Sequence, residues 1–188
     1  MKTADLMDDF QDELQSCTLQ FRSYGRVAAF YGPCRTVKCW NDNVLVKQLM
    51  TTPGNGGVLV IDGAGSLETA LMGDLIAELG RSNGWSGVVI NGAVRDTVAI
   101  GTMDFGVKAL GSNPRKSQKD GVGEVDVPVE FGTVRFKPGN WIYCDEDGIV
   151  VATRELPKRY TGRERLGRLS GWTGLTAEHC DGLYVWRV

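Results

Sequence analysis

Two short motifs, Gly73-Asp74 and Arg95-Asp96, carry the side chains of this 188-residue chain that are best suited to chemistry. An arginine guanidinium is always cationic and can hold a carboxylate through two parallel hydrogen bonds. Aspartate supplies the oxygen ligands that Mg²⁺ prefers in proteins. Because an Arg-Asp dipeptide alone is most often a surface ion pair, the neighbouring elements must decide whether these motifs form a site.

The second motif follows a predicted strand. Residues 58–61 and 87–90 are continuous apolar runs between glycine-rich breaks, a pattern typical of strands that are buried on both faces. In an open α/β sheet, ligand-binding groups gather beyond the carboxyl ends of such strands. Arg95 lies a few residues beyond the second run, where the sequence therefore predicts a binding edge.

The first motif interrupts a predicted helix. Residues 67–82 have helical character, but Gly73 breaks the segment and would start a second helix with Asp74 near its N-terminus. The free backbone amides at such a helix start, those of Leu75 and Ile76, could bind an anion.

The glycine loop at residues 63–66 does not match a nucleotide-binding motif. The dinucleotide pattern GxGxxG would begin at Gly63 and require glycine at position 68, which is Glu68, and no phosphate-loop GK[ST] is present. We therefore expect a strand-to-helix turn that uses glycine for its backbone angles.

The remaining pattern predicts an α/β fold in which β/α units come first and antiparallel strands follow. We expect one domain over residues 1–153 and a C-terminal extension over 154–188 that can pack on a neighbouring subunit. The further predicted elements are a helix over 5–16 that Asp5 can cap, a strand over 34–40, and short strands over 124–130, 133–136, 141–144 and 149–152.

Composition excludes several classes of mechanism and partner. The only histidine is His179, which rules out a zinc site built on several histidines. A net charge of −2 argues against a general nucleic-acid binder. The five cysteines form no CxxC pair, and no apolar run approaches the ~18 residues of a membrane span. We expect a cytoplasmic protein with reduced, buried thiols.

Charge is distributed unevenly along the chain. Residues 1–14 contain five acidic side chains and one lysine, whereas residues 154–168 contain six basic and two acidic side chains. These segments are either solvated faces or contact surfaces for another subunit or a partner protein.

Residues 58–96 resemble the family that joins regulator of ribonuclease activity A to the class II 4-hydroxy-4-methyl-2-oxoglutarate aldolases. The aldolase signature D-x20-R-D is complete as Asp74, Arg95 and Asp96. Residues 36–39 (TVKC) and 143–149 (YCDEDGI) also match, and the similarity extends from about residue 5 to residue 153.

The resemblance implies a single-domain α/β fold of the swivelling β/β/α type, with a central β-sandwich flanked by helices. It also implies a homotrimer, or a hexamer made of two trimers, with the site between subunits. Asp96 would bind Mg²⁺ or Mn²⁺, and Asp74 would orient a water molecule that carries the proton. Arg95 and the amides of Leu75 and Ile76 would hold the pyruvoyl part of the substrate beside Gly73.

The implied activity is a metal-dependent lyase that cleaves 4-hydroxy-4-methyl-2-oxoglutarate-type 2-oxo acids to pyruvate and decarboxylates oxaloacetate. Such chemistry needs neither a Schiff-base lysine nor a histidine base, which suits this composition. The acid that aldolases receive from a neighbouring subunit could be Glu155, Glu164, Glu178 or none of these, because the tail departs from the family.

Two alternatives remain open from the sequence. The chain could be a protein regulator that binds an RNA-degrading endoribonuclease of the RNase E type through its acidic N-terminal segment, without contacting nucleic acid. It could also be a structural relative with neither role, in which Asp74, Arg95 and Asp96 form an ion network.

Overall fold

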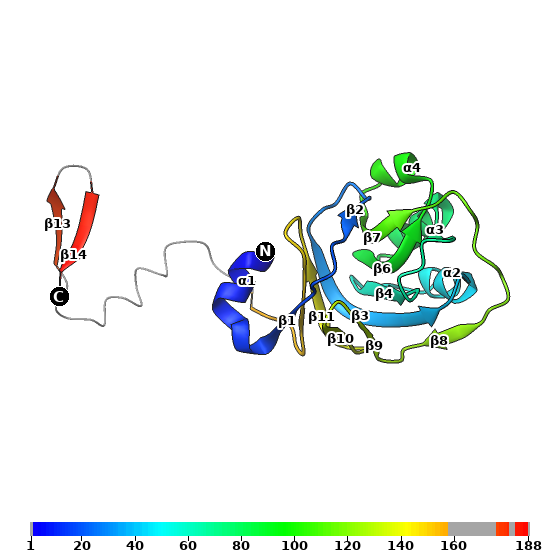
Figure 1. Ribbon diagram of the computed structural model, residues 1–188, viewed down its shortest axis with the longest axis horizontal. Helices are drawn as coiled ribbons and strands as arrows, with labels where there is room; N and C mark the ends of the chain where they lie inside the picture. The colour runs from blue at the N-terminus through cyan, green and yellow to red at the C-terminus, as the bar shows by residue number, and fades with distance from the viewer. Residues whose placement is uncertain (1, 158–175, 181–182, 188) are drawn as a thin grey trace. The chain divides into compact units, whose positions relative to one another are not determined.

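The computed structural model describes residues 2–157, 176–180 and 183–187 (Figure 1). The helices are α1 (Thr3–Phe10), the 3-10 turn η1 (Gln11–Glu13), α2 (Val44–Met50), α3 (Asp74–Ser82) and α4 (Thr97–Gly101). The strands are β1 (Leu14–Ser16), β2 (Arg22–Ser23), β3 (Phe30–Cys39), β4 (Val58–Asp62), β5 (Ala70–Met72), β6 (Gly87–Val94), β7 (Gly106–Ser112), β8 (Gly123–Val125), β9 (Val129–Phe131), β10 (Val134–Phe136), β11 (Trp141–Cys144), β12 (Ile149–Ala152), β13 (Thr176–Cys180) and β14 (Leu183–Arg187).

A mixed sheet organises the described part of the chain, with the strand order β1-β12-β11-β3-β4-β6-β7-β2. Strands β3, β4, β6 and β7 are parallel to one another, and β5 pairs in parallel with β6. The apolar runs predicted as doubly buried strands are the core of β4 and β6, and every residue of β6 is buried. The predicted α/β class is confirmed.

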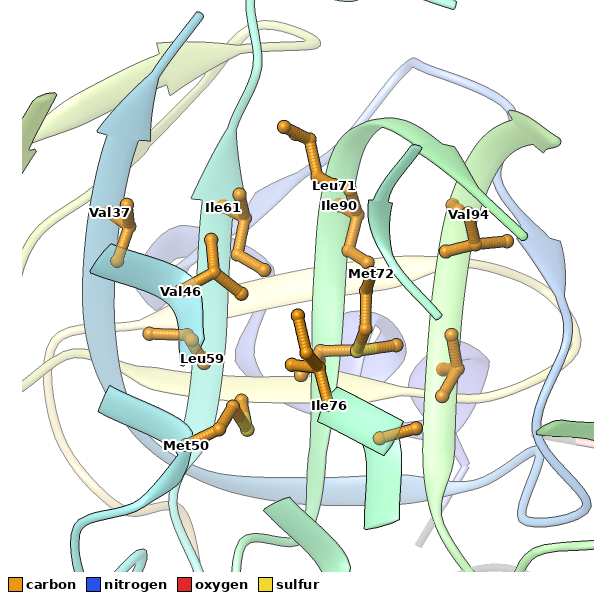
Figure 2. Packing of buried hydrophobic residues seen from close by; sticks show 14 of the residues in the cluster. Val37, Val46, Met50, Leu59, Ile61, Leu71, Met72, Ile76, Ile90 and Val94 are labelled. Atoms are coloured by element: carbon orange, nitrogen blue, oxygen red, sulfur yellow. The ribbon is translucent and has the colours of Figure 1, made fainter. Parts of the chain in front are cut away.

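Helices cover one face of the parallel strands. Side chains of α2, α3 and α4 pack there on alternate residues of the four parallel strands. Figure 2 shows Val46 and Met50 of α2 on opposite sides of Leu59, and Ile76 of α3 near Met72 and Ile90. Because α3 is held in this way by its apolar face, the orientation of its first turn is determined by the core.

The other face of the parallel strands packs against the antiparallel half of the sheet. Val58, Val60 and Val89 lie in one cluster with residues of β11 and β12 and of the separate two-stranded sheet that β9 and β10 form, so these strands enclose an apolar interior. On the far side of β11 and β12, α1 contributes Leu6 to a third cluster with Tyr143. The layers are therefore helices, parallel strands, antiparallel strands and α1.

Three predicted elements differ from the structure. The helix expected over 5–16 begins at Thr3 and ends at Phe10 without a side-chain cap, and residues 14–16 instead form β1, which pairs with β12. Residues 70–72 form β5 and are not helical. The strand expected over 124–130 is divided into β8 and β9. The strands β1, β5 and β8 each pair with a strand far away in the sequence, and this pairing outweighs the local pattern.

The chain divides into two compact units, Met1–Leu156 and Pro157–Val188. Within the second unit, β13 and β14 form an antiparallel hairpin. The residues 158–175 that carry most of the basic segment lie outside the described residues. No described helix is both long and apolar enough to cross a membrane.

Asp145 fastens the start of α1 to the turn between β11 and β12. Its buried carboxylate accepts hydrogen bonds from the Thr3 amide and hydroxyl, both at 2.6 Å, and from the amides of Asp147 and Gly148 at 3.0 and 3.3 Å. Burial raises the pKa of Asp145, but these donors outweigh burial and hold the pKa below its ordinary value of 3.8.

Replacing Asp145 with alanine is expected to lower the free energy of unfolding by about 3 kcal/mol at neutral pH, because buried donors lose their acceptor. A carboxyl with a lowered folded-state pKa stabilises above its ordinary pKa and loses that effect as pH falls through the folded value. In urea unfolding, the difference in the free energy of unfolding between wild type and Asp145→Ala should therefore become smaller below about pH 3.8. The exposed neighbour Asp147→Ala is the matched control, and an equal loss there would contradict this account.

Candidate functional site

Pairing between β5 and β6 brings the two motifs together. Met72, the last residue of β5, is in register with Val94, the last residue of β6, and the Arg95 amide donates to the Met72 carbonyl at 3.0 Å. Parallel strands that end in register deliver their next residues to the same edge. Gly73 and Arg95 therefore leave the sheet side by side, although twenty-one residues separate them in sequence.

Gly73 lies directly against the Arg95-Asp96 pair. A Cβ atom on Gly73 would stand 2.6 Å from Asp96 Oδ2 and 3.1 Å from Arg95 Nε. The guanidinium Nε and the carboxylate Oδ2 of the pair are 3.2 Å apart, with 28% and 37% of the two side chains exposed. The absence of a side chain at position 73 thus leaves room for two opposite charges at the start of α3.

Asp96 has an unusual backbone conformation. Its φ and ψ are 55° and 39°, in the left-handed region, and it is the N-cap residue of α4. Such angles carry a cost for non-glycine residues and tend to occur at functional sites. The turn directs the Asp96 carboxylate back toward Gly73. An extended backbone at position 96 would instead carry the carboxylate away from Gly73.

The start of α3 confirms the predicted helix start at Asp74, although the strand β5, and not a first helix, precedes Gly73. Gly73 is the N-cap and Asp74 the first helical residue. Asp74 Oδ1 accepts the Leu75 amide at 2.8 Å. The Leu75 side chain is 77% exposed, whereas Ile76 is buried in the core. The core thus anchors this turn through Ile76, while the Asp74 and Leu75 side chains remain at its accessible side.

The donor set suits a hard divalent ion held by few protein atoms. Within the described residues, no group of three or more His, Cys, Asp or Glu side chains is placed to hold a metal. Asp96 supplies carboxylate oxygens beside the space that a Cβ on Gly73 would fill. This arrangement fits Mg²⁺, which commonly keeps several water ligands and uses one or two carboxylates.

The glycine loop after β4 is not arranged as a phosphate cradle. The amides of Gly63 and Gly65 both donate to the Asn91 carbonyl, at 3.0 and 3.1 Å. The Ala64 amide donates to Asp62 Oδ1 at 2.9 Å, and the Ser66 amide donates to the Gly63 carbonyl at 3.0 Å. All four loop amides are therefore engaged within the protein.

Sequence reasoning missed a polar network that holds β5 in place. The Asn41 Oδ1 atom accepts the hydroxyls of Ser66 and Thr69, at 2.9 and 3.1 Å. The hydroxyls of Thr69 and Ser117 lie 3.0 Å apart, and the Ser117 hydroxyl donates to the Ala70 carbonyl at 2.8 Å. Isolated Ser, Thr and Asn residues carry no spacing signal, so only the tertiary contacts reveal this support.

The buried thiols do not offer a competing nucleophile. Cys17, Cys34, Cys39 and Cys144 are free and buried. Burial raises the pKa of Cys34 and of Cys39 to about 12, so neither forms a thiolate at neutral pH. The charged groups of the described unit that are concentrated at the strand edge are thus the better candidates for chemistry.

Comparison with known proteins identifies the family of the chain. Residues 3–151 match the family model for RraA-like proteins, described as Aldolase/RraA. A Geobacillus kaustophilus protein named S-adenosylmethionine:2-dimethylmenaquinone methyltransferase is 51% identical, with a TM-score of 0.82 over 83% of this chain and 97% of that one. The RNA-processing inhibitor RraA from Thermus thermophilis is 40% identical, with a TM-score of 0.81 over 86% of this chain and 98% of that one.

A more distant structure shares the fold alone. This is an unusual RraA-family protein from Streptomyces coelicolor, 23% identical, with a TM-score of 0.67 over 81% of this chain and 80% of that one. The family model spans most of the first compact unit, including both motifs of the candidate site. On this evidence, the chain belongs to the RraA-like family of the Aldolase/RraA type.

Proposed function

We propose that this protein is a divalent-metal-dependent lyase that releases pyruvate from 4-carboxy-2-oxo acids of the 4-hydroxy-4-methyl-2-oxoglutarate type and decarboxylates oxaloacetate. The observation that carries the proposal is the contact of Gly73 with both Arg95 and Asp96 at the carboxyl edge of the sheet. That contact places a fixed cation, a carboxylate and a helix start around one small space.

Each side chain has a defined task in this proposal. Arg95 binds the substrate carboxylate and stabilises the negative charge that develops when the carbon–carbon bond breaks. The α3 N-terminus adds positive potential on the same side. The substrate would meet the Ile76 amide there, and it would reach the Leu75 amide only by displacing Asp74 Oδ1. Asp74 accepts and returns a proton through a water molecule.

Asp96 would hold Mg²⁺ or Mn²⁺, and water would complete most of the coordination. When bound, the ion supplies Lewis acidity at the 2-oxo group. No lysine or histidine base is needed, consistent with a chain whose single histidine lies beyond residue 157.

An oxaloacetate assay tests the proposal. Purified protein with added Mg²⁺ or Mn²⁺ should release pyruvate faster than the same metal without protein, and excess chelator should abolish the difference. Activity that persists unchanged in chelator would contradict the metal-dependent mechanism. Equal rates with and without protein would remove the lyase proposal for oxaloacetate, and 4-hydroxy-4-methyl-2-oxoglutarate would be assayed in parallel.

We also propose that the site is completed in a homotrimer or a hexamer. Five of the exposed large apolar side chains follow the ends of β3, β4, β5 and β6 or lie in the loop after β7: Trp40, Leu67, Leu75, Val98 and Val122. Exposed apolar groups concentrated around a site are typical of an interface. Sedimentation velocity should give a trimer or hexamer for wild type, and a monomer at working concentration would contradict this assembly.

A second candidate function is protein-level regulation of an RNA-degrading endoribonuclease. It is favoured by the name of the Thermus protein, an RNA-processing inhibitor, and by the acidic surface of α1, where Asp5 and Asp8 are exposed. Basic RNA-binding segments would be attracted to such a surface. A pull-down with the host's ribonucleases should lose binding when Asp5, Asp8 and Asp12 are changed to asparagine. Unchanged binding would remove α1 from the proposal.

The methyltransferase activity in the name of the Geobacillus protein is not supported by the glycine loop of this chain. A nucleoside cofactor that bound there would have to displace the internal acceptors of the loop amides, including the Asn91 carbonyl.

A further inference from the structure

A lysine lies inside the apolar interior between the two halves of the sheet. Lys108 is in the middle of β7 and is only 1% exposed. It is in register with Val89 on β6, which belongs to the interior cluster, and with Ser23 on the edge strand β2. An aliphatic side chain at this position would pack without the cost of burying a charge.

The ammonium group of Lys108 has few hydrogen-bond acceptors and no ion-pair partner among the described residues. It has three N–H donors, and the hydrogen bond that the structure gives it is to the Ser23 hydroxyl, at an Nζ–Oγ distance of 3.2 Å. None of the ion pairs among residues 2–157 includes Lys108. A buried cation without a counter-charge is costly, so this position would benefit from an anion.

The neighbouring thiol does not provide that counter-charge. Burial raises the pKa of Cys144 far above its ordinary value, and Lys108 lowers it by less. Cys144 is therefore a neutral thiol at physiological pH. The carboxylate of Asp145, the next residue, is already occupied by Thr3 and by the turn amides.

Ser23 connects this buried cation to the surface. It is exposed and lies on β2, the strand that ends the sheet. Cross-strand partners in an antiparallel pair share a face of the sheet, so Ser23 and Lys108 project on the same side. Figure 1 shows β2 alongside β7 at this margin of the described unit.

We propose that Ser23 and Lys108 form an anion site at the β2 edge that accepts a phosphate-type oxyanion. The oxyanion is either a free phosphate or a phosphoryl group attached to Ser23. In the attached form, Ser23 Oγ forms a bond to the γ-phosphorus of a nucleoside triphosphate in a protein kinase. The bond from that phosphorus to the nucleoside diphosphate breaks, and the hydroxyl proton passes to the kinase's base.

Thermal unfolding in inorganic phosphate tests the free form. At equal ionic strength, replacing chloride with phosphate should raise the Tm of wild type by about 3 °C through preferential binding to the folded state. The variant Lys108→Met keeps the length of the side chain and removes its charge, so its Tm should rise only by the general stabilising effect of phosphate on folded proteins, and by less than that of wild type. Lys108→Met without phosphate should be at least as stable as wild type, which shows that it folds.

Substitution at Ser23 tests the attached form. Ser23→Glu should raise the Tm above that of Ser23→Gln, and this difference should disappear in the Lys108→Met background. A rise in Tm with phosphate that is larger in wild type than in Lys108→Met supports the free anion. A higher Tm of Ser23→Glu than of Ser23→Gln that occurs only when Lys108 is present supports the attached phosphoryl group. If both effects are absent, or are equal in the Lys108→Met background, the proposal is overturned.

Discussion

Asp96→Asn is expected to reduce metal-dependent pyruvate release by at least about 100-fold while leaving the protein folded. The loss follows because a neutral amide binds Mg²⁺ or Mn²⁺ poorly, and groups that stabilise developing charge commonly contribute factors of this size. Asparagine adopts the left-handed backbone region, so φ of 55° at position 96 is tolerated. The Tm should stay within a few degrees of wild type.

The metal dependence separates this account from a purely structural role. Asp96→Asn should require much higher Mn²⁺ for half-maximal rate, measured by titrating the metal at saturating oxaloacetate. The matched control is Asp104→Asn, which removes an exposed carboxylate that pairs with Arg26 outside the site. Its rate should equal that of wild type. Full activity in Asp96→Asn at ordinary metal concentration would show that Asp96 does not hold the ion.

Gly73→Ala is expected to reduce the same activity by about 10- to 100-fold with little change in overall stability. The new Cβ would meet Asp96 Oδ2 at 2.6 Å, closer than such contacts occur, and the Arg95 guanidinium at 3.1 Å. At least one of these side chains must move, and displacements near 1 Å can cost two orders of magnitude in rate. The backbone angles of Gly73, φ −121° and ψ −172°, are available to alanine.

A second glycine provides the control for this substitution. Gly148 lies in the turn between β11 and β12, and a Cβ atom added there would meet no other group within 4 Å, so Gly148→Ala should retain wild-type activity. Steady-state kinetics on oxaloacetate and circular dichroism melting curves would be measured for both variants. Wild-type kinetics in Gly73→Ala would mean that the space beside Asp96 is not used in catalysis.

The site residues could be predicted from the sequence because each lies where a local sequence pattern begins or ends. Gly73 breaks an apolar segment, and Arg95-Asp96 follows a run that is too apolar to be exposed. The hydrogen-bonded network around Thr69 and Ser117 could not be predicted in this way, because these two residues lie 48 positions apart in the sequence. The strand β5 was missed for a related reason: three buried apolar residues fit a helix as well as a strand until their partner is known.

The sequence by itself determined the α/β class, the two doubly buried strands, the helix start after Gly73 and the residue types that can bind an anion and a cation. These depend on local backbone preferences and on the periodicity of apolar side chains, which neighbouring residues encode. Only the tertiary structure decided that β5 ends in register with β6 and that Gly73 contacts Arg95 and Asp96. It alone also decided that Lys108 is buried beside an exposed serine. Such contacts depend on strand pairing between distant segments, and their free energy becomes available only after the chain has closed the intervening loops.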